Sequence, residues 1–203
     1  MEQLRLFIAI ELDDALRGAL KRAQKQIEDE CNRVLVAKNG VRWVAPENIH
    51  LTLKFLGNAK RAQIPTLQNV LERAAQSTAP FELYARGVGC FPNAHRPNNV
   101  WVGLEGDVER AALLTQRIEA ECAAVGFARE ARGFTPHLTL GRVKRDASNS
   151  ERAALGAMIK NKPPESYGVI HARAVYLIAS DLRPSGPVYT VLAENLFAED
   201  STP

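Results

Sequence analysis

The tripeptide His-Leu-Thr occurs twice in this chain, as His50-Leu51-Thr52 and as His137-Leu138-Thr139. A free imidazole titrates near pH ~6.5, so two of them at one site could hold one neutral and one protonated ring at the same pH. The neutral ring could then remove a proton from an attacking water while the charged ring protonates a leaving oxygen. Each such transfer is typically worth about 10²–10⁴ in rate. This chemistry suits cleavage of a phosphodiester.

Each tripeptide lies within a longer internal repeat. The segment Asn48-Ile49-His50-Leu51-Thr52-Leu53 resembles Thr135-Pro136-His137-Leu138-Thr139-Leu140, and the two histidines are 137 − 50 = 87 residues apart. Alternate residues of a strand share a face, so His and Thr point one way and the leucines point the other way, into a core. A period of this length is too long for a solenoid. It indicates two copies of one half-domain whose polar faces meet.

The other groups that a phosphate site needs lie close to the second tripeptide. Arg142 follows Thr139 by three residues, and a guanidinium there could hold phosphate through two hydrogen bonds. The threonine hydroxyls could donate hydrogen bonds to the non-bridging oxygens. A metal site is the competing hypothesis, but two histidines are too few ligands for zinc and the motif contains no Asp, Glu or Cys. We therefore predict a site that uses no metal and no other cofactor.

A single histidine on a strand is more often a structural or surface residue than a catalyst. Repetition of both His and Thr is harder to explain by packing, because an outward strand position would also accept Ser, Lys, Gln or Glu. Of the other histidines, His95 lies in a loop rich in Asn and Pro and could touch substrate, whereas His171 opens a strand and is expected to be structural. Cys31, Cys90 and Cys122 lie in no catalytic context, since no His/Asn pattern points at them.

Composition restricts the class of protein. The 203 residues suffice for one domain or for two small lobes, and 46% hydrophobic and 24% charged residues are ordinary for a soluble globular protein. A net charge of +3 favours anionic partners only weakly, so any nucleic-acid role must rest on a local site. We expect no signal peptide, no membrane span and, with three widely spaced cysteines, no disulfide framework. These features predict a cytoplasmic protein.

Strands and helices are predicted to alternate along the chain. Strands are expected over 4–12, 42–44, 49–56, 81–88, 100–104, within 134–143, 169–180 and 188–196, and helices over 15–36, 61–75, between Asp107 and Gly126, and over 152–159. Asp13 or Asp14, Asp107 and the box Ser148–Glu151 are candidate helix caps, and Gly57-Asn58 is a turn signal. Several neighbouring strands look hairpin-connected. We therefore predict an α+β fold with antiparallel sheets, not a doubly wound parallel sheet.

At these residues the chain resembles the two-histidine (2H) phosphoesterase superfamily and, within it, the bacterial RNA 2′,3′-cyclic phosphodiesterases, also called 2′-5′ RNA ligases. Both signatures are present in order, and the resemblance spans nearly the whole chain. The segments that carry it are Arg5–Ile10, Trp43, Asn48–Gly57, Gly87–Pro92 with Val100-Trp101, Phe134–Arg142, Leu177–Ser180 and Gly186–Tyr189.

The resemblance implies one bilobal, pseudo-symmetric domain over residues 1–203, with two antiparallel sheets flanking a central cleft and helices outside. It implies hydrolysis of a 2′,3′-cyclic phosphate at an RNA end to a 2′-phosphate. In that scheme His50 is the acid, His137 is the base, and Thr52, Thr139 and Arg142 hold the phosphate. Phe55 falls where the family places an aromatic ring near the terminal nucleobase, and core packing is its alternative role. The near symmetry of the site leaves the acid and base assignment open.

Three functions compete. The first is a metal-independent RNA 2′,3′-cyclic phosphodiesterase that acts as a monomer on RNA ends or on small nucleotides with a 2′,3′-cyclic phosphate. The second is another reaction at the same site, either 2′-5′ ligation of RNA or cleavage of other small cyclic or 2′-5′ linked nucleotides. The third is a non-catalytic module that binds nucleotides or RNA ends, although binding alone needs no matched acid and base. Spacing does not separate the first two, because one pair of histidines serves both.

Overall fold

The computed structural model describes residues 2–34, 40–184 and 186–198, and within them the strands join into one antiparallel sheet. The strands are β1 (Gln3–Ile10), β2 (Val41–Trp43), β3 (Leu51–Lys60), β4 (Phe81–Phe91), β5 (Asn99–Gly106), β6 (His137–Val143), β7 (Ser166–Ala172), β8 (Ala174–Arg183) and β9 (Gly186–Leu196). The α-helices are α1 (Asp14–Val34), α2 (Ile64–Gln76), α3 (Val108–Ala124) and α4 (Asn149–Lys160), and short 3-10 helices span Pro46–Asn48 and Arg61–Gln63. The sheet order is β7-β4-β5-β6-β3-β1-β8-β9, with β2 paired to β6.

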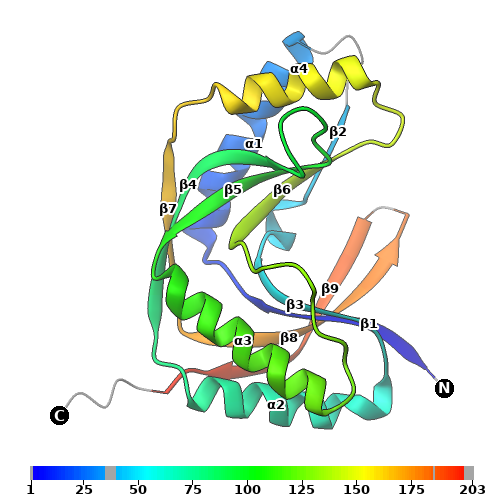
Figure 1. Cartoon of the computed structure of the whole chain (residues 1–203), viewed down its shortest axis with the longest axis vertical. Helices are drawn as coiled ribbons and strands as arrows, with labels where there is room; N and C mark the ends of the chain where they lie inside the picture. Colours follow the sequence, from blue (N-terminus) through cyan, green and yellow to red (C-terminus); the bar gives the residue numbers. More distant parts are fainter. Residues whose placement is uncertain (1, 35–39, 185, 199–203) are drawn as a thin grey trace.

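The sheet has two wings that meet at β3 and β6. One wing runs outward from β3 through β1 and β8 to β9, and the other runs from β6 through β5 and β4 to β7. Within the described residues a single register pair, Leu51 with Leu138, joins the wings. The predicted bilobal antiparallel α+β fold is therefore confirmed, and the two expected sheets are the wings of one strongly curled sheet (Figure 1).

The helices pack on the two wings in pairs. α2 and α3 lie together at one end of the molecule and contact β8, β9 and β3, whereas α1 and α4 lie at the other end and contact β7 and β4 (Figure 1). Leu20, Leu71 and Ile118 from three of these helices join Leu51 and Leu138 in one buried cluster. Burial of each such side chain stabilises the fold by roughly 1.5–3 kcal/mol. The leucines of both His-Leu-Thr repeats therefore serve the core, as strand alternation predicts.

Polar side chains fix the helix ends. The Asp13 carboxylate accepts a hydrogen bond from Leu16 N at 2.7 Å, and Ser148 with Glu151 forms the predicted capping box at the start of α4. Asp107 occupies the N-cap position of α3 without a side-chain cap bond, and its carboxylate instead accepts from Glu82 N at 3.1 Å. The predicted end of the first helix at Val36 lies outside the described residues.

The structure corrects two predictions about the strands. Gly57-Asn58 is not a turn, because β3 continues to Lys60 and Gly57 takes its φ of 69° inside a strand that bulges against β1. The single strand expected over 169–180 is two strands, β7 and β8, because β7 pairs with β4 on one wing and β8 pairs with β1 on the other. The strand expected within 134–143 is confirmed as β6, which begins at His137.

Candidate functional site

The register of β3 and β6 brings the two repeats together. Leu51 lies opposite Leu138, and the strands are antiparallel. One residue to either side, His50 must therefore lie opposite Thr139, and Thr52 opposite His137. Side chains directly across an antiparallel pair have Cβ atoms about 4.5–5.5 Å apart. The four polar residues thus form a compact set on the face of the sheet away from the core, which we call the site face.

Each repeat contains a β-bulge just after its threonine. In the first repeat, β1 pairs Ala9 with Thr52 and Ile8 with Lys54, so Leu53 is an extra residue in β3. Both Leu53 and Lys54 are buried. The strand alternation is therefore shifted by one position, which returns the next residue, Phe55, to the site face.

The second repeat bulges at the equivalent position. β5 pairs Trp101 with Thr139 and Val100 with Gly141, so Leu140 is the extra residue in β6. Arg142 returns to the site face as Phe55 does, 87 residues later in the chain. Phe55 is 59% exposed, so its alternative role in core packing is wrong. Phe55 and Arg142 occupy corresponding positions in the two halves.

Aromatic rings from two other strands enclose His50. Its ring stacks on Phe7 of β1 at a centroid distance of 4.6 Å and meets the edge of Tyr189 of β9 at 5.5 Å. Burial lowers the pKa of His50 to about 4, although the Asn48 carbonyl, 2.8 Å from Nδ1, acts in the opposite direction. The positive charges of Arg17 and Arg142 lower this pKa further.

His137 has a looser aromatic enclosure. Its ring meets Phe91 of β4 edge-on at 5.0 Å and lies 6.2 Å from Trp101 of β5. Nδ1 lies 2.8 Å from the carbonyl oxygen of Thr135. Burial lowers the pKa of His137 also, against the effect of that carbonyl.

The two rings are held in the same way. In each, Nδ1 donates to the carbonyl two residues earlier in the chain, because a carbonyl oxygen only accepts. Nε2 of His50 and Nε2 of His137 make no hydrogen bond with any described residue. Both neutral rings therefore present a lone pair at Nε2. If one of the two rings takes up a proton at Nε2, the pair supplies one proton donor and one proton acceptor to a shared substrate.

Side chains outside the site fix these strands in place. The buried Gln24 of α1 donates from Nε2 to the carbonyls of Val44 and Leu140, both at 2.8 Å, so it ties the bulge of β6 to the segment after β2. Asn48 Nδ2 donates to the Pro187 carbonyl at 2.9 Å and holds the β8–β9 hairpin beside His50.

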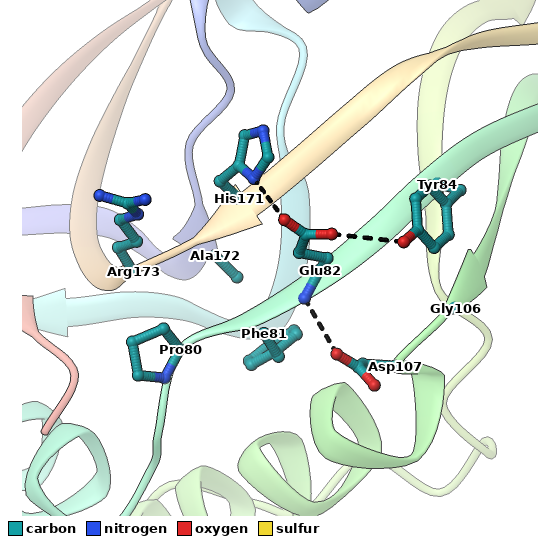
Figure 2. Close-up of a pocket in the computed structure, with 9 residues that line it drawn as sticks. All are labelled: Pro80, Phe81, Glu82, Tyr84, Gly106, Asp107, His171, Ala172 and Arg173. Atoms are coloured by element: carbon teal, nitrogen blue, oxygen red, sulfur yellow. Dashed lines mark hydrogen bonds and ion pairs between the residues drawn. The ribbon is translucent and has the colours of Figure 1, made fainter. Parts of the chain in front are cut away.

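The remaining histidines are His95 and His171. His95 is exposed in the loop after β4. His171 of β7 lines a cavity of about 410 Å³ at the far end of β4 and β5, where its Nδ1 lies 2.9 Å from Glu82 (Figure 2).

No group of three or more His, Cys, Asp or Glu side chains in the described part of the chain could hold a metal ion. Among the helices described, none is long and apolar enough to cross a membrane.

Four aromatic residues that enclose the two histidines were not predicted as site residues. They are Phe7, Tyr189, Phe91 and Trp101. Each lies in a segment that carries the family resemblance, and this was the only signal for them. Hydrophobic periodicity assigns such residues to the core, and only the sheet order brings them around the imidazoles. Cys31 and Cys122 are buried free thiols, and Cys90 is half-buried.

Curled antiparallel wings joined at a pair of His-x-Thr strands define a two-histidine phosphoesterase. The model of the LigT-like phosphoesterase family matches this chain twice, over residues 10–102 and 102–189, so each match contains one of the two repeats. The chain belongs to the LigT-like phosphoesterase family, and it is therefore an enzyme.

Relatives and solved structures match over nearly the full length. A Methanothermobacter thermautotrophicus protein named RNA 2′,3′-cyclic phosphodiesterase is 34% identical over 93% of this chain and 96% of its own. One of the same name from Archaeoglobus fulgidus is 35% identical over 92% and 96%. A crystal structure from Thermus thermophilus has 29% identity and a TM-score of 0.76, covering 97% of this chain and 100% of that one. Escherichia coli LigT complexed with 3′-AMP, at 23% identity and a TM-score of 0.74, covers 97% and 99% and shares the fold.

Proposed function

We propose that this protein hydrolyses a 2′,3′-cyclic phosphate at an RNA end to a 2′-phosphate, with His50 and His137 as its acid–base pair and with no metal. The observation that carries the proposal is the matched geometry of the two rings. Each lies across the β3–β6 junction from a threonine, and each has Nδ1 fixed by a carbonyl and Nε2 without a partner among the described residues. Curated relatives that cover more than nine-tenths of the chain carry the name of this activity.

The proposed reaction balances with these groups. One Nε2 takes a proton from water as the water oxygen bonds to phosphorus. The P–O3′ bond breaks, and the other ring gives its Nε2 proton to O3′, which leaves a 2′-phosphate and a free 3′-hydroxyl. Thr52, Thr139 and Arg142 would donate hydrogen bonds to the non-bridging oxygens, where charge develops. Phe55 would lie under the terminal base.

The assignment of acid and base is part of the proposal. The family resemblance implies that His50 is the acid. Its stronger burial makes it the harder ring to protonate in the free protein, so a bound phosphate anion would have to raise the pKa of His50 for it to serve as the acid. The opposite assignment, with His50 as the base, needs no such shift.

Turnover of a cyclic-phosphate oligonucleotide in EDTA tests the function. We expect conversion to the 2′-phosphate, and a loss of at least about 10² in rate for His50→Ala and for His137→Ala. His171→Ala is the matched control, because His171 lines the cavity at the far end of β4 and β5. Near-wild-type rates in both site variants would refute the proposal. A panel of 2′-5′ linked and other cyclic nucleotides, with end-group analysis, separates it from the other reactions at this site.

A further inference from the structure

A second hollow of the surface begins at Arg142. It has a volume of about 590 Å³ and is lined by Arg42, Arg142, Val143, Lys144, Arg145 and Asp146. Four cations and one carboxylate give this cavity a net charge of +3, the same as the net charge of the whole 203-residue chain. The lining of this cavity is therefore strongly basic, although the whole chain is only weakly so.

Two of these cations face each other across neighbouring strands. Arg42 of β2 is the register partner of Arg142 of β6, and both are exposed. Like charges directly opposite in an antiparallel pair are destabilising. Other arginines of the described chain, such as Arg73 and Arg132, form ion pairs with carboxylates, but Arg42, Arg142 and Arg145 form none within the described residues. An anion between them would remove the repulsion.

Arg142 links this cavity to the histidine site. The bulge at Leu140 places Arg142 on the site face, three residues after Thr139, and the same residue lines the cavity. The other side of the site is aromatic, with Phe55 and Phe7 at a centroid distance of 6.3 Å. A substrate with a base at one end and further phosphates at the other would match this polarity.

We propose that the cavity binds the phosphodiester next to the cyclic end, so that the enzyme is built for a single-stranded RNA chain and not for a mononucleotide. Arg42 and Arg145 are the residues that would recognise this second phosphate. The inference rests on the proposed function and names its substrate more closely. Backbone phosphates of a single strand are held largely by electrostatic contacts, which salt weakens.

A comparison of short substrates tests the proposal. A nucleoside 2′,3′-cyclic phosphate lacks the second phosphate, a dinucleotide with the same end has one, and a tetranucleotide has three. We expect kcat/KM to rise about tenfold or more from the mononucleotide to the dinucleotide. Arg42→Ala and Arg145→Ala should each remove about tenfold more kcat/KM on the dinucleotide than on the mononucleotide. A mononucleotide that carries an added 5′-phosphate tells whether an isolated phosphate suffices.

Arg173→Ala is the matched control. Arg173 is also an exposed arginine without an ion pair in the described structure, and it lines the other cavity, at the far end of β4 and β5 (Figure 2). Its loss should change kcat/KM for neither substrate. Arg42→Ala should also keep or raise the melting temperature at low salt, because it removes a like-charge pair, whereas loss of a merely structural arginine would lower it.

Binding separates the failure of this inference from failure of the proposed function. The affinity of a labelled RNA tetranucleotide with a 3′-phosphate needs no turnover, and the slope of log K against log salt should fall by about 0.7 for each phosphate contact removed. Equal kcat/KM for mononucleotide and dinucleotide, or an unchanged salt slope in Arg42→Ala, overturns the inference. The opposite result is also distinguishable. If no cyclic phosphate is turned over but the RNA still binds in a salt-dependent way that Arg42→Ala weakens, the proposed function is overturned. The cavity would then remain an RNA-binding site.

Discussion

Leu51 of β3 lies directly opposite Leu138 of β6, and this is the register pair that joins the two wings of the sheet. Both side chains are buried, at 1% and 0% exposure. Because the next residues on either side turn to the opposite face, a pair of core leucines determines where two histidines and two threonines meet. The packing of the core and the geometry of the site are thus set by the same contact.

The approximate symmetry of this junction ends one step further out. Phe55 and Arg142 occupy equivalent positions after equivalent bulges, yet one is a ring and the other a cation. Around the histidines, Phe7 and Tyr189 enclose one ring more tightly than Phe91 and Trp101 enclose the other. Because of these differences, the two similar halves of the site are not interchangeable. An asymmetric substrate would therefore bind in one orientation.

The first prediction concerns pH. Both histidines have lowered pKa values, to about 4 for His50 and below the ordinary value of 6.5 for His137. In the proposed mechanism, the productive free protein carries one proton on the pair. Above the higher of the two pKa values, its fraction falls about tenfold per pH unit, and near pH 4 the second proton removes the base. The profile of kcat/KM, which reports the free enzyme, should peak below pH 6.5. An optimum above about pH 7 would contradict this.

The second prediction concerns the threonine hydroxyls. Thr52→Val and Thr139→Val keep the side-chain shape and remove the donor, so each should lower kcat by about 10². The serine variants keep the hydroxyl and should stay within about tenfold of wild type. Steady-state kinetics on a cyclic-phosphate oligonucleotide provides the measurement. Equal losses in the valine and serine variants would mean that the methyl group, and not the hydroxyl, matters.

The third prediction concerns Phe55, which is 59% exposed on the site face. Its replacement by alanine should change the free energy of unfolding by less than about 0.5 kcal/mol, as for an exposed residue. It should weaken substrate binding by about 1–3 kcal/mol through lost base stacking. Tyr84→Ala, at an exposed aromatic residue of the far cavity, is the control and should leave KM unchanged. An unchanged KM in Phe55→Ala would contradict the proposed stacking role.

The fourth prediction concerns the space beneath Trp101. A Cβ added at Gly89 would lie 2.2 Å from the indole ring, so Gly89→Ala must push the ring that flanks His137. Overpacking of this kind typically costs about 1–3 kcal/mol in stability, and turnover should fall with it. At Gly133, by contrast, a Cβ would meet nothing within 4 Å. Thermal unfolding of Gly89→Ala and Gly133→Ala should therefore differ, and equal melting temperatures would refute this account.

The sequence by itself determined the local features of this protein. Strand alternation placed His50 with Thr52 and His137 with Thr139, and the side-chain pattern of Ser148 and Glu151 set the start of α4. These properties depend on neighbours in the chain, which a periodic pattern records. The repeat of 87 residues also indicated two related halves. The sequence pattern does not itself record that the polar faces of those halves meet.

Only the tertiary structure decided the features that depend on the register between strands. The bulge at Leu53 appears when β3 pairs with β1, and it places Phe55 on the site face and buries Lys54, whose Nζ lies 2.7 Å from Glu119 of α3. The register of β2 and β6 likewise sets Arg42 opposite Arg142, 100 positions further along the chain. A strand pattern in one segment carries no information about its partner. The enclosure of the histidines and the charge beside them therefore arise only when distant strands pair.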